Sequence, residues 1–115
     1  MTKPTRNEVL MSIHDGRIEL NDWACEFVMG WDEDEMEDNI DFFPATDKND
    51  IRRMLDRIGE LNKRPEFLDE LQRIVFGVSH LFTAFDQSQV WYLLNAAPSQ
   101  ITAASVLAVI GDGND

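Results

Sequence analysis

The segment at residues 98–110 is apolar on nearly every side of a helix, and this feature limits the possible folds more than any other. Pro98 suits the first position of a helix and Gly111 follows the last apolar residue, so these two residues bracket it. A helix that is hydrophobic all round must be covered by other elements. The sequence therefore predicts a central helix whose apolar positions are Ile101, Ala104, Val106, Leu107, Ala108, Val109 and Ile110.

Two helices are predicted before the acidic part of the chain. The first begins at Thr5 and Glu8, which have the spacing of a capping box. The second covers residues 20–31, where apolar residues recur at the helical period, with a cap at Asn21 and a terminator at Gly30. We expect this pair of helices to serve in packing.

Two further helices are predicted in the middle of the chain. Thr46 is expected to cap the first of them, whose apolar stripe covers residues 51–61, and Pro65 separates it from the second, at residues 67–78. The apolar residues Val90 to Leu94 fit a buried strand and a buried helical turn equally. The predicted fold class is mainly α, a small bundle of about five helices. It becomes α+β if that last run forms a short strand.

Length and composition indicate one domain over residues 1–115. A chain of 115 residues, 43% of them hydrophobic, can bury one modest core. The single cysteine, Cys25, excludes an internal disulfide and a thiolate zinc cluster, and its apolar neighbours predict a buried side chain. No apolar run reaches the roughly 20 residues that span a bilayer, so we expect a soluble intracellular protein without membrane contact. The tail at residues 111–115 is expected to fray.

The most acidic part of the chain is residues 32–41. Its seven carboxylates belong to Asp32, Glu33, Asp34, Glu35, Glu37, Asp38 and Asp41. Because like charges repel, we expect this run to be an extended, solvated loop that becomes ordered when it binds a basic partner. Trp31 flanks it on one side and Phe42 and Phe43 on the other, and we expect these aromatic residues to anchor its ends.

The charge of the chain disfavours direct contact with nucleic acid. The net charge is −12, and the second predicted helix carries Glu19, Asp22 and Glu26 but no lysine or arginine. Although the first two helices resemble a helix-turn-helix, such a surface repels phosphate groups. A negative field speeds association with basic proteins, so we expect a basic protein partner.

Positive charge is concentrated in one segment. Six of the ten basic residues lie between Lys48 and Arg64. Three interpretations stay open: the basic groups pair with carboxylates of the same helix, they neutralise the acidic run, or they bind an anionic patch of a partner.

No complete catalytic or metal-binding motif is present. His14 and His80 are the only histidines, and neither belongs to an HExxH motif or accompanies a glycine-framed serine. A calcium loop that opened with the acidic run would need an oxygen ligand, a glycine and a glutamate where the chain has Met36, Glu37 and Phe43. We therefore expect a protein that is not an enzyme and needs no metal or cofactor.

Three blocks of the sequence resemble a family of small phage proteins. The blocks are residues 23–31 (WACEFVMGW), 45–61 (ATDKNDIRRMLDRIGEL) and 91–111 (WYLLNAAPSQITAASVLAVIG). In this order they are similar to pieces of the small uncharacterised bacteriophage and prophage proteins of the phage ABA-sandwich type. The resemblance implies an origin in a mobile element and strands in the middle of the chain, where residues 65–78 predict a helix. It brings no catalytic residues.

The leading hypothesis is a non-enzymatic inhibitor that a phage encodes and that acts in the cytoplasm of its bacterial host. The carboxylates of residues 32–41 would occupy the basic groove of a nucleic-acid-handling defence protein, such as a CRISPR effector or a restriction enzyme. The alternative is an accessory or structural phage protein that acts through the aromatic residues Trp23, Trp31, Phe42 and Phe43. The oligomeric state stays open.

Overall fold

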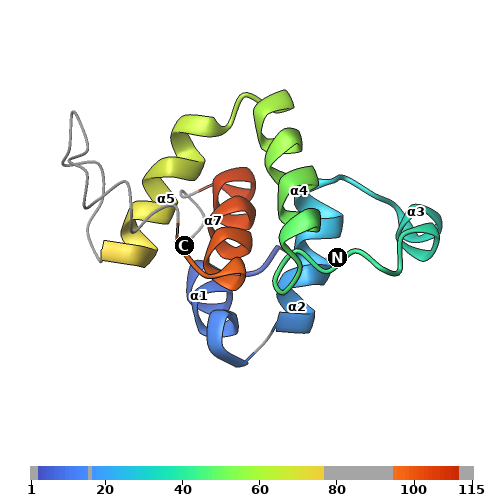
Figure 1. Cartoon of the computed structure of the whole chain (residues 1–115), viewed down its shortest axis with the longest axis horizontal. Helices are drawn as coiled ribbons and strands as arrows, with labels where there is room; N and C mark the ends of the chain where they lie inside the picture. Colours follow the sequence, from blue (N-terminus) through green and yellow to red (C-terminus); the bar gives the residue numbers. More distant parts are fainter. Residues whose placement is uncertain (1–2, 16, 77–94, 112–115) are drawn as a thin grey trace.

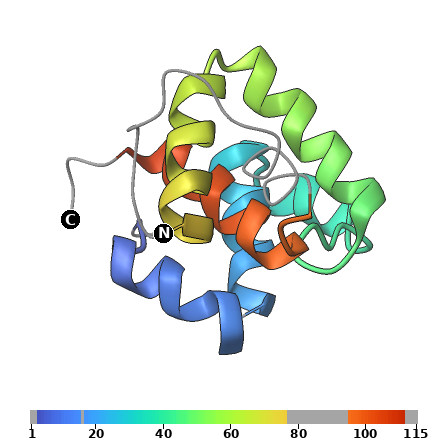
Figure 2. The same cartoon turned by 60° about the vertical axis from the view of Figure 1, so that its left-hand side comes forward.

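Helix α7 (Pro98–Ile110) runs through the centre of the fold, as its apolar surface predicts (Figure 1). The computed structural model describes residues 3–15, 17–76 and 95–111. Most side chains of α7 are buried, and Figure 2 shows other helices around it. The elements that contact it are α1 (Arg6–Asp15), α2 (Arg17–Trp23), the π-helical turn η1 (Ala24–Val28), α4 (Lys48–Glu60) and α5 (Arg64–Phe76).

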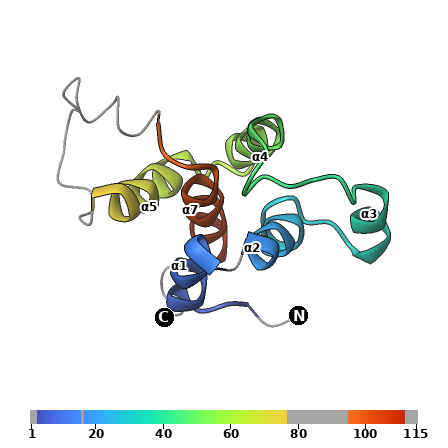
Figure 3. The same ribbon diagram turned by 60° about the horizontal axis from the view of Figure 1, so that its bottom comes forward.

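The prediction of a mainly α fold is confirmed. Residues 3–15, 17–76 and 95–111 form six α-helices and one π-helical turn, and no strand. The remaining α-helix, α3 (Glu33–Asp38), lies away from the others (Figures 1 and 3). The residues Val90 to Leu94, where a strand is the alternative, lie outside the described part of the chain, as do residues 112–115 of the tail.

The beginning of α1 follows the predicted capping box. The Glu8 amide donates to Thr5 Oγ1 at 3.1 Å, and the Thr5 amide donates to Glu8 Oε1 at 2.8 Å. These two bonds satisfy amide groups that the first turn of a helix leaves without partners. The sequence therefore defines this end of the helix by local chemistry alone.

The predicted cap of the second helix is wrong. Helix α2 begins at Arg17, so Asn21 lies inside it. Its side chain is used at long range, because Asn21 Oδ1 accepts from the Ala45 amide at 2.9 Å in a buried position. Gly30 does end the helical segment, with a φ of 69° that suits glycine.

The middle helices match the prediction with two changes at their starts. Asp47, and not Thr46, is the cap of α4, since its Oδ1 accepts from the Asn49 amide at 2.8 Å. Helix α5 begins at Arg64 and includes Pro65 in its first turn. Proline is tolerated there because the helix does not use the backbone N–H groups of its first turn. Residues 64–76 are thus helical, as their periodicity predicts and unlike the strands that the family resemblance implies.

A buried ion pair joins two helices that are distant in the sequence. Arg6 at the start of α1 forms a two-bond pair with Glu70 of α5, in which Nη1 donates to Oε2 at 3.0 Å and Nη2 donates to Oε1. The side chains are only 17% and 6% exposed. The pair therefore replaces water as the partner of both charges.

Candidate protein-binding site

The acidic run forms a short helix, so the prediction of an extended loop is wrong. Helix α3 begins with a capping box in which the Glu35 amide donates to Asp32 Oδ1 at 2.8 Å and the Asp32 amide donates to Glu35 Oε1 at 3.2 Å. At its other end Asn39 Nδ2 donates to the Glu35 carbonyl at 2.8 Å. These local bonds, together with acidic residues in the first turn, outweigh the repulsion between like charges.

Helix formation concentrates the negative charge. Five of the six residues of α3 are carboxylates. At a rise of about 1.5 Å per residue they occupy about 9 Å, which is one charge per about 1.8 Å of helix axis. Duplex DNA carries one negative charge per about 1.7 Å of its axis. An extended strand of the same composition would carry only one per about 4 Å.

The two ends of the acidic segment are held together by aromatic rings. The ring centroids of Trp31 and Phe42 lie 5.0 Å apart at an angle of 68°, an edge-to-face contact. The Arg53 guanidinium lies over both rings, 5.8 Å from the Trp31 centroid and 5.0 Å from the Phe42 centroid. Residues 32–41 therefore leave the bundle and return to it at one place on α4.

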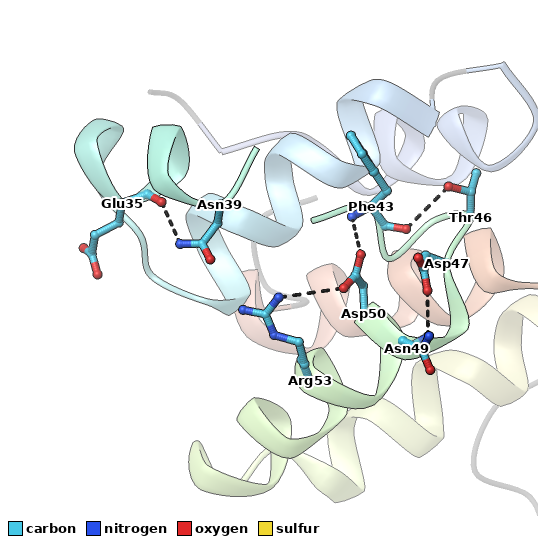
Figure 4. Close-up of polar contacts among 8 residues, drawn as sticks. All are labelled: Glu35, Asn39, Phe43, Thr46, Asp47, Asn49, Asp50 and Arg53. Carbon is cyan, nitrogen blue, oxygen red and sulfur yellow. Dashed lines mark hydrogen bonds and ion pairs between the residues drawn. The ribbon is translucent and has the colours of Figure 1, made fainter. Parts of the chain in front are cut away.

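Hydrogen bonds fix the same place (Figure 4). The Phe43 amide donates to Asp50 Oδ2 at 2.8 Å, and the other oxygen of Asp50 lies 3.7 Å from Arg53 Nη1. On the incoming side, Arg57 Nε donates to the Val28 carbonyl at 3.3 Å. Asp50, Arg53 and Arg57 of α4 thus position α3 as a projecting helix with a defined base.

The predicted contact residues divide into two groups. The seven carboxylates of residues 32–41 are exposed, and none of them forms an ion pair with another described residue. Phe42 is buried at 3% exposure and Trp31 is half-buried, so both belong to the base of the projection, while Phe43 is 46% exposed. The sequence does not predict the contact of Arg53 with the two rings or that of Asp50 with the Phe43 amide, since no local pattern marks either.

The basic segment of residues 48–64 pairs mainly within its own neighbourhood. Arg53 lies near Asp50, and Arg57 Nη1 lies 3.2 Å from Glu60 Oε1. These are partly exposed pairs one helical turn apart, each of which stabilises the fold by about 0.2–0.5 kcal/mol. Arg53 and Arg57 thus lie near Asp50 and Glu60, and no described ion pair joins either of them to a carboxylate of α3.

A hollow of about 270 Å³ lies between α3 and the helical segment formed by α2 and η1. Its walls are mainly apolar, with Asp22 among the polar lining groups. Burial raises the pKa of Asp22, and the nearby Glu19 carboxylate raises it further. The apolar side chains that line the hollow are those of Cys25, Met36, Ile40, Phe42 and Phe43.

The Cys25 thiol in this wall is expected to react slowly with alkylating reagents. Burial, with smaller contributions from Asp22 and Asp50 that outweigh Arg53, raises its pKa from 9.0 to about 11. Only the thiolate reacts, so at about pH 9 we expect alkylation by iodoacetamide to be at least about tenfold slower than for free cysteine. The rate should keep rising towards about pH 11 and can be followed by mass spectrometry. A midpoint near pH 9 in the folded protein, equal to that in urea, would contradict this prediction.

The described residues do not bring together a group of side chains that could hold a metal ion. No cluster of three or more histidine, cysteine or carboxylate side chains there has the arrangement of a metal site. His14 is exposed at the end of α1, and His80 lies outside the described residues. Among the described helices, none combines the length and apolar character needed to cross a bilayer.

Comparison of the chain with models of protein families, with curated proteins and with solved structures gives no match. The geometry and charge of α3 and its base are therefore the features of the molecule that bear on its function.

Proposed function

We propose that this protein is a non-enzymatic inhibitor that binds a basic, nucleic-acid-handling protein through α3. In this proposal α3 takes the place of a nucleic-acid backbone in a basic groove. The partner is a defence protein of a bacterial host, such as a CRISPR effector or a restriction enzyme, and the inhibitor is encoded by a phage and acts in the host cytoplasm. The phage origin rests on the sequence resemblance alone.

One observation carries the proposal, namely the charge density of a projecting helix. The carboxylates of α3 have nearly the axial spacing of the charges of duplex DNA, and they point to solvent without ion-pair partners among the described residues. A partner that binds DNA phosphates through lysine and arginine can meet the same density of charge here. Because the helix is already formed, little ordering entropy opposes binding.

The partner can be identified by expressing the protein in bacterial strains that each carry one restriction or CRISPR system. Recovery of plating by a phage sensitive to that system identifies the inhibited enzyme. Failure to inhibit every system of a broad panel, together with no competition against duplex DNA for the purified enzymes, would contradict the proposal.

Neutralising the outer carboxylates of α3 is expected to slow association with that enzyme. The variant replaces each acid by its amide and leaves the capping pair Asp32 and Glu35 intact: Glu33→Gln, Asp34→Asn, Glu37→Gln and Asp38→Asn. Since charge steers encounter, we expect the association rate at about 50 mM salt to fall at least about tenfold. For the unchanged protein the rate should also fall steeply between about 50 and 500 mM salt, as the Debye length shortens.

A control variant separates local from overall charge. It neutralises four exposed carboxylates elsewhere, with the same change in net charge: Glu19→Gln, Asp56→Asn, Glu60→Gln and Glu66→Gln. We expect it to retain most of the association rate. Equal losses in the two variants, or an association rate that does not depend on salt, would reject mimicry by α3.

One observation favours the alternative, an accessory or structural phage protein with an aromatic interface. Phe43 is 46% exposed, although Trp31 and Phe42 are used in the base of the projection. A stable oligomer that Phe43→Ser dissociates, without inhibition of any nuclease, would favour this second function.

A further inference from the structure

The hollow beside α3 has an apolar rim in a strongly acidic environment. Ile40 is 70% exposed and Phe43 is 46% exposed, and both line the hollow. Asp41 stands between them in the chain, and Asp22 lies in the opposite wall. Exposed apolar side chains grouped beside an open hollow make this place a candidate contact surface.

The size of the hollow sets the size of its occupant. A cavity of about 150 Å³ holds one benzene ring. A hollow of about 270 Å³ therefore accommodates one large side chain, such as that of tryptophan, phenylalanine or leucine. It is smaller than most pockets for drug-sized ligands, which start at about 300 Å³.

The apolar rim indicates which of two partner surfaces fits it, a groove that only binds phosphates or a basic segment that also carries an apolar side chain. A groove that fits DNA phosphates needs only cationic and polar groups, and nothing in it would fill an apolar hollow. A segment with one apolar side chain between lysines and arginines satisfies both parts of this surface. Its anchor would contact Met36, Ile40 and Phe43, while its cations would face Asp22 and the carboxylates of α3.

We propose that the hollow between α3 and α2–η1 binds a basic segment of the partner protein through one large apolar anchor. This rests on the proposed function, because it takes the partner of α3 to be basic, and it adds the feature that the partner must have beside its basic groove. Burying one such anchor adds binding energy, whereas the charges mainly speed association.

Two fluorescein-labelled peptides provide the test. Both consist of lysine, arginine and alanine, and they differ only in a central tryptophan or serine. By fluorescence anisotropy we expect the tryptophan peptide to bind at least about tenfold more tightly than the serine peptide. This corresponds to a gain of about 1.4 kcal/mol in binding free energy from burial of the side chain. The tryptophan peptide should also slow alkylation of Cys25, because Cys25 lies in the wall of the hollow.

Rim variants show whether the hollow is the anchor site. Ile40→Ser with Phe43→Ser is expected to reduce binding of the tryptophan peptide to the level of the serine peptide. The control is Met11→Ser with Leu68→Ser, which removes apolar side chains of similar exposure, 73% and 42%, from α1 and α5. This control should leave the difference between the peptides unchanged.

The remaining outcomes separate the two proposals. The variant with the four amide substitutions in α3 serves here as neutralised α3. If both peptides bind the unchanged protein equally and neither binds this variant, the hollow is not an anchor site but the proposed function stands. If neither peptide binds although the protein inhibits its enzyme, only the inference about the hollow fails. If the tryptophan peptide binds equally well to neutralised α3, the occupant is apolar but not basic, and this inference is overturned. A dimer in sedimentation that the rim variant dissociates would assign the hollow to a second copy of the chain and would also overturn it.

Discussion

Replacing Leu107 with alanine is expected to lower the free energy of unfolding by about 2–5 kcal/mol. Leu107 lies in α7 at 1% exposure, and α7 contacts helices on several sides, so the surroundings cannot easily collapse into the space. The loss is a large share of the roughly 5–15 kcal/mol that stabilises a typical domain. Urea unfolding followed by circular dichroism measures it, with the slope checked for two-state behaviour.

The control is the same substitution on the surface. Leu68 of α5 is 42% exposed, so Leu68→Ala leaves almost no cavity and should change stability by less than about 0.5 kcal/mol. If Leu107→Ala cost no more than Leu68→Ala, α7 would not be the centre of the core.

Replacing Arg6 with methionine is expected to cost about 3–5 kcal/mol at neutral pH. The substitution keeps most of the buried aliphatic volume but leaves the Glu70 carboxylate, 6% exposed, without the guanidinium that now binds both of its oxygens. A buried charge without a partner is far more costly than a missing surface pair. The same urea titration measures the change.

A double variant tests whether the cost comes from the unpaired charge. When Glu70→Met is added to Arg6→Met, neither charge of this pair remains, and we expect most of the lost stability to return. Glu66→Gln provides the surface reference, because the pair of Glu66 with Lys63 is partly exposed at 3.9 Å and should contribute less than about 1 kcal/mol. A double variant as unstable as the single one would show that packing and not charge makes Arg6 important.

These stability variants act far from α3, and this separates folding from function. The residues of α3 are joined to the bundle through the contacts of Trp31, Phe42 and Phe43 with α4 and with each other. Since its exposed carboxylates form no ion pairs with described residues, neutralising them should change binding and leave the unfolding transition nearly unchanged.

Local chemistry in the sequence determined where most helices lie. The pattern of residues 98–110 predicts both the bounds and the central place of α7, because an all-round apolar helix has only one stable environment. The capping box of Thr5 and Glu8 marks the start of α1 in the same way. Asp32 and Glu35 have the same capping-box spacing, so the sequence also contains the signal for the start of α3. The repulsion between the carboxylates of the run favours a loop instead, and the two signals conflict.

The tertiary structure alone decided the long-range contacts, including those at the base of the acidic run. Asn21 looks like a helix cap in the sequence, yet it binds the Ala45 amide, and Arg6 binds Glu70 across 64 positions of the chain. Arg53 reaches two aromatic rings, and the hollow is walled by residues of α2, η1, α3 and the segment after α3. Such contacts depend on the distances and angles between packed helices, and a pattern of apolar spacing defines the face of each helix but not its neighbours.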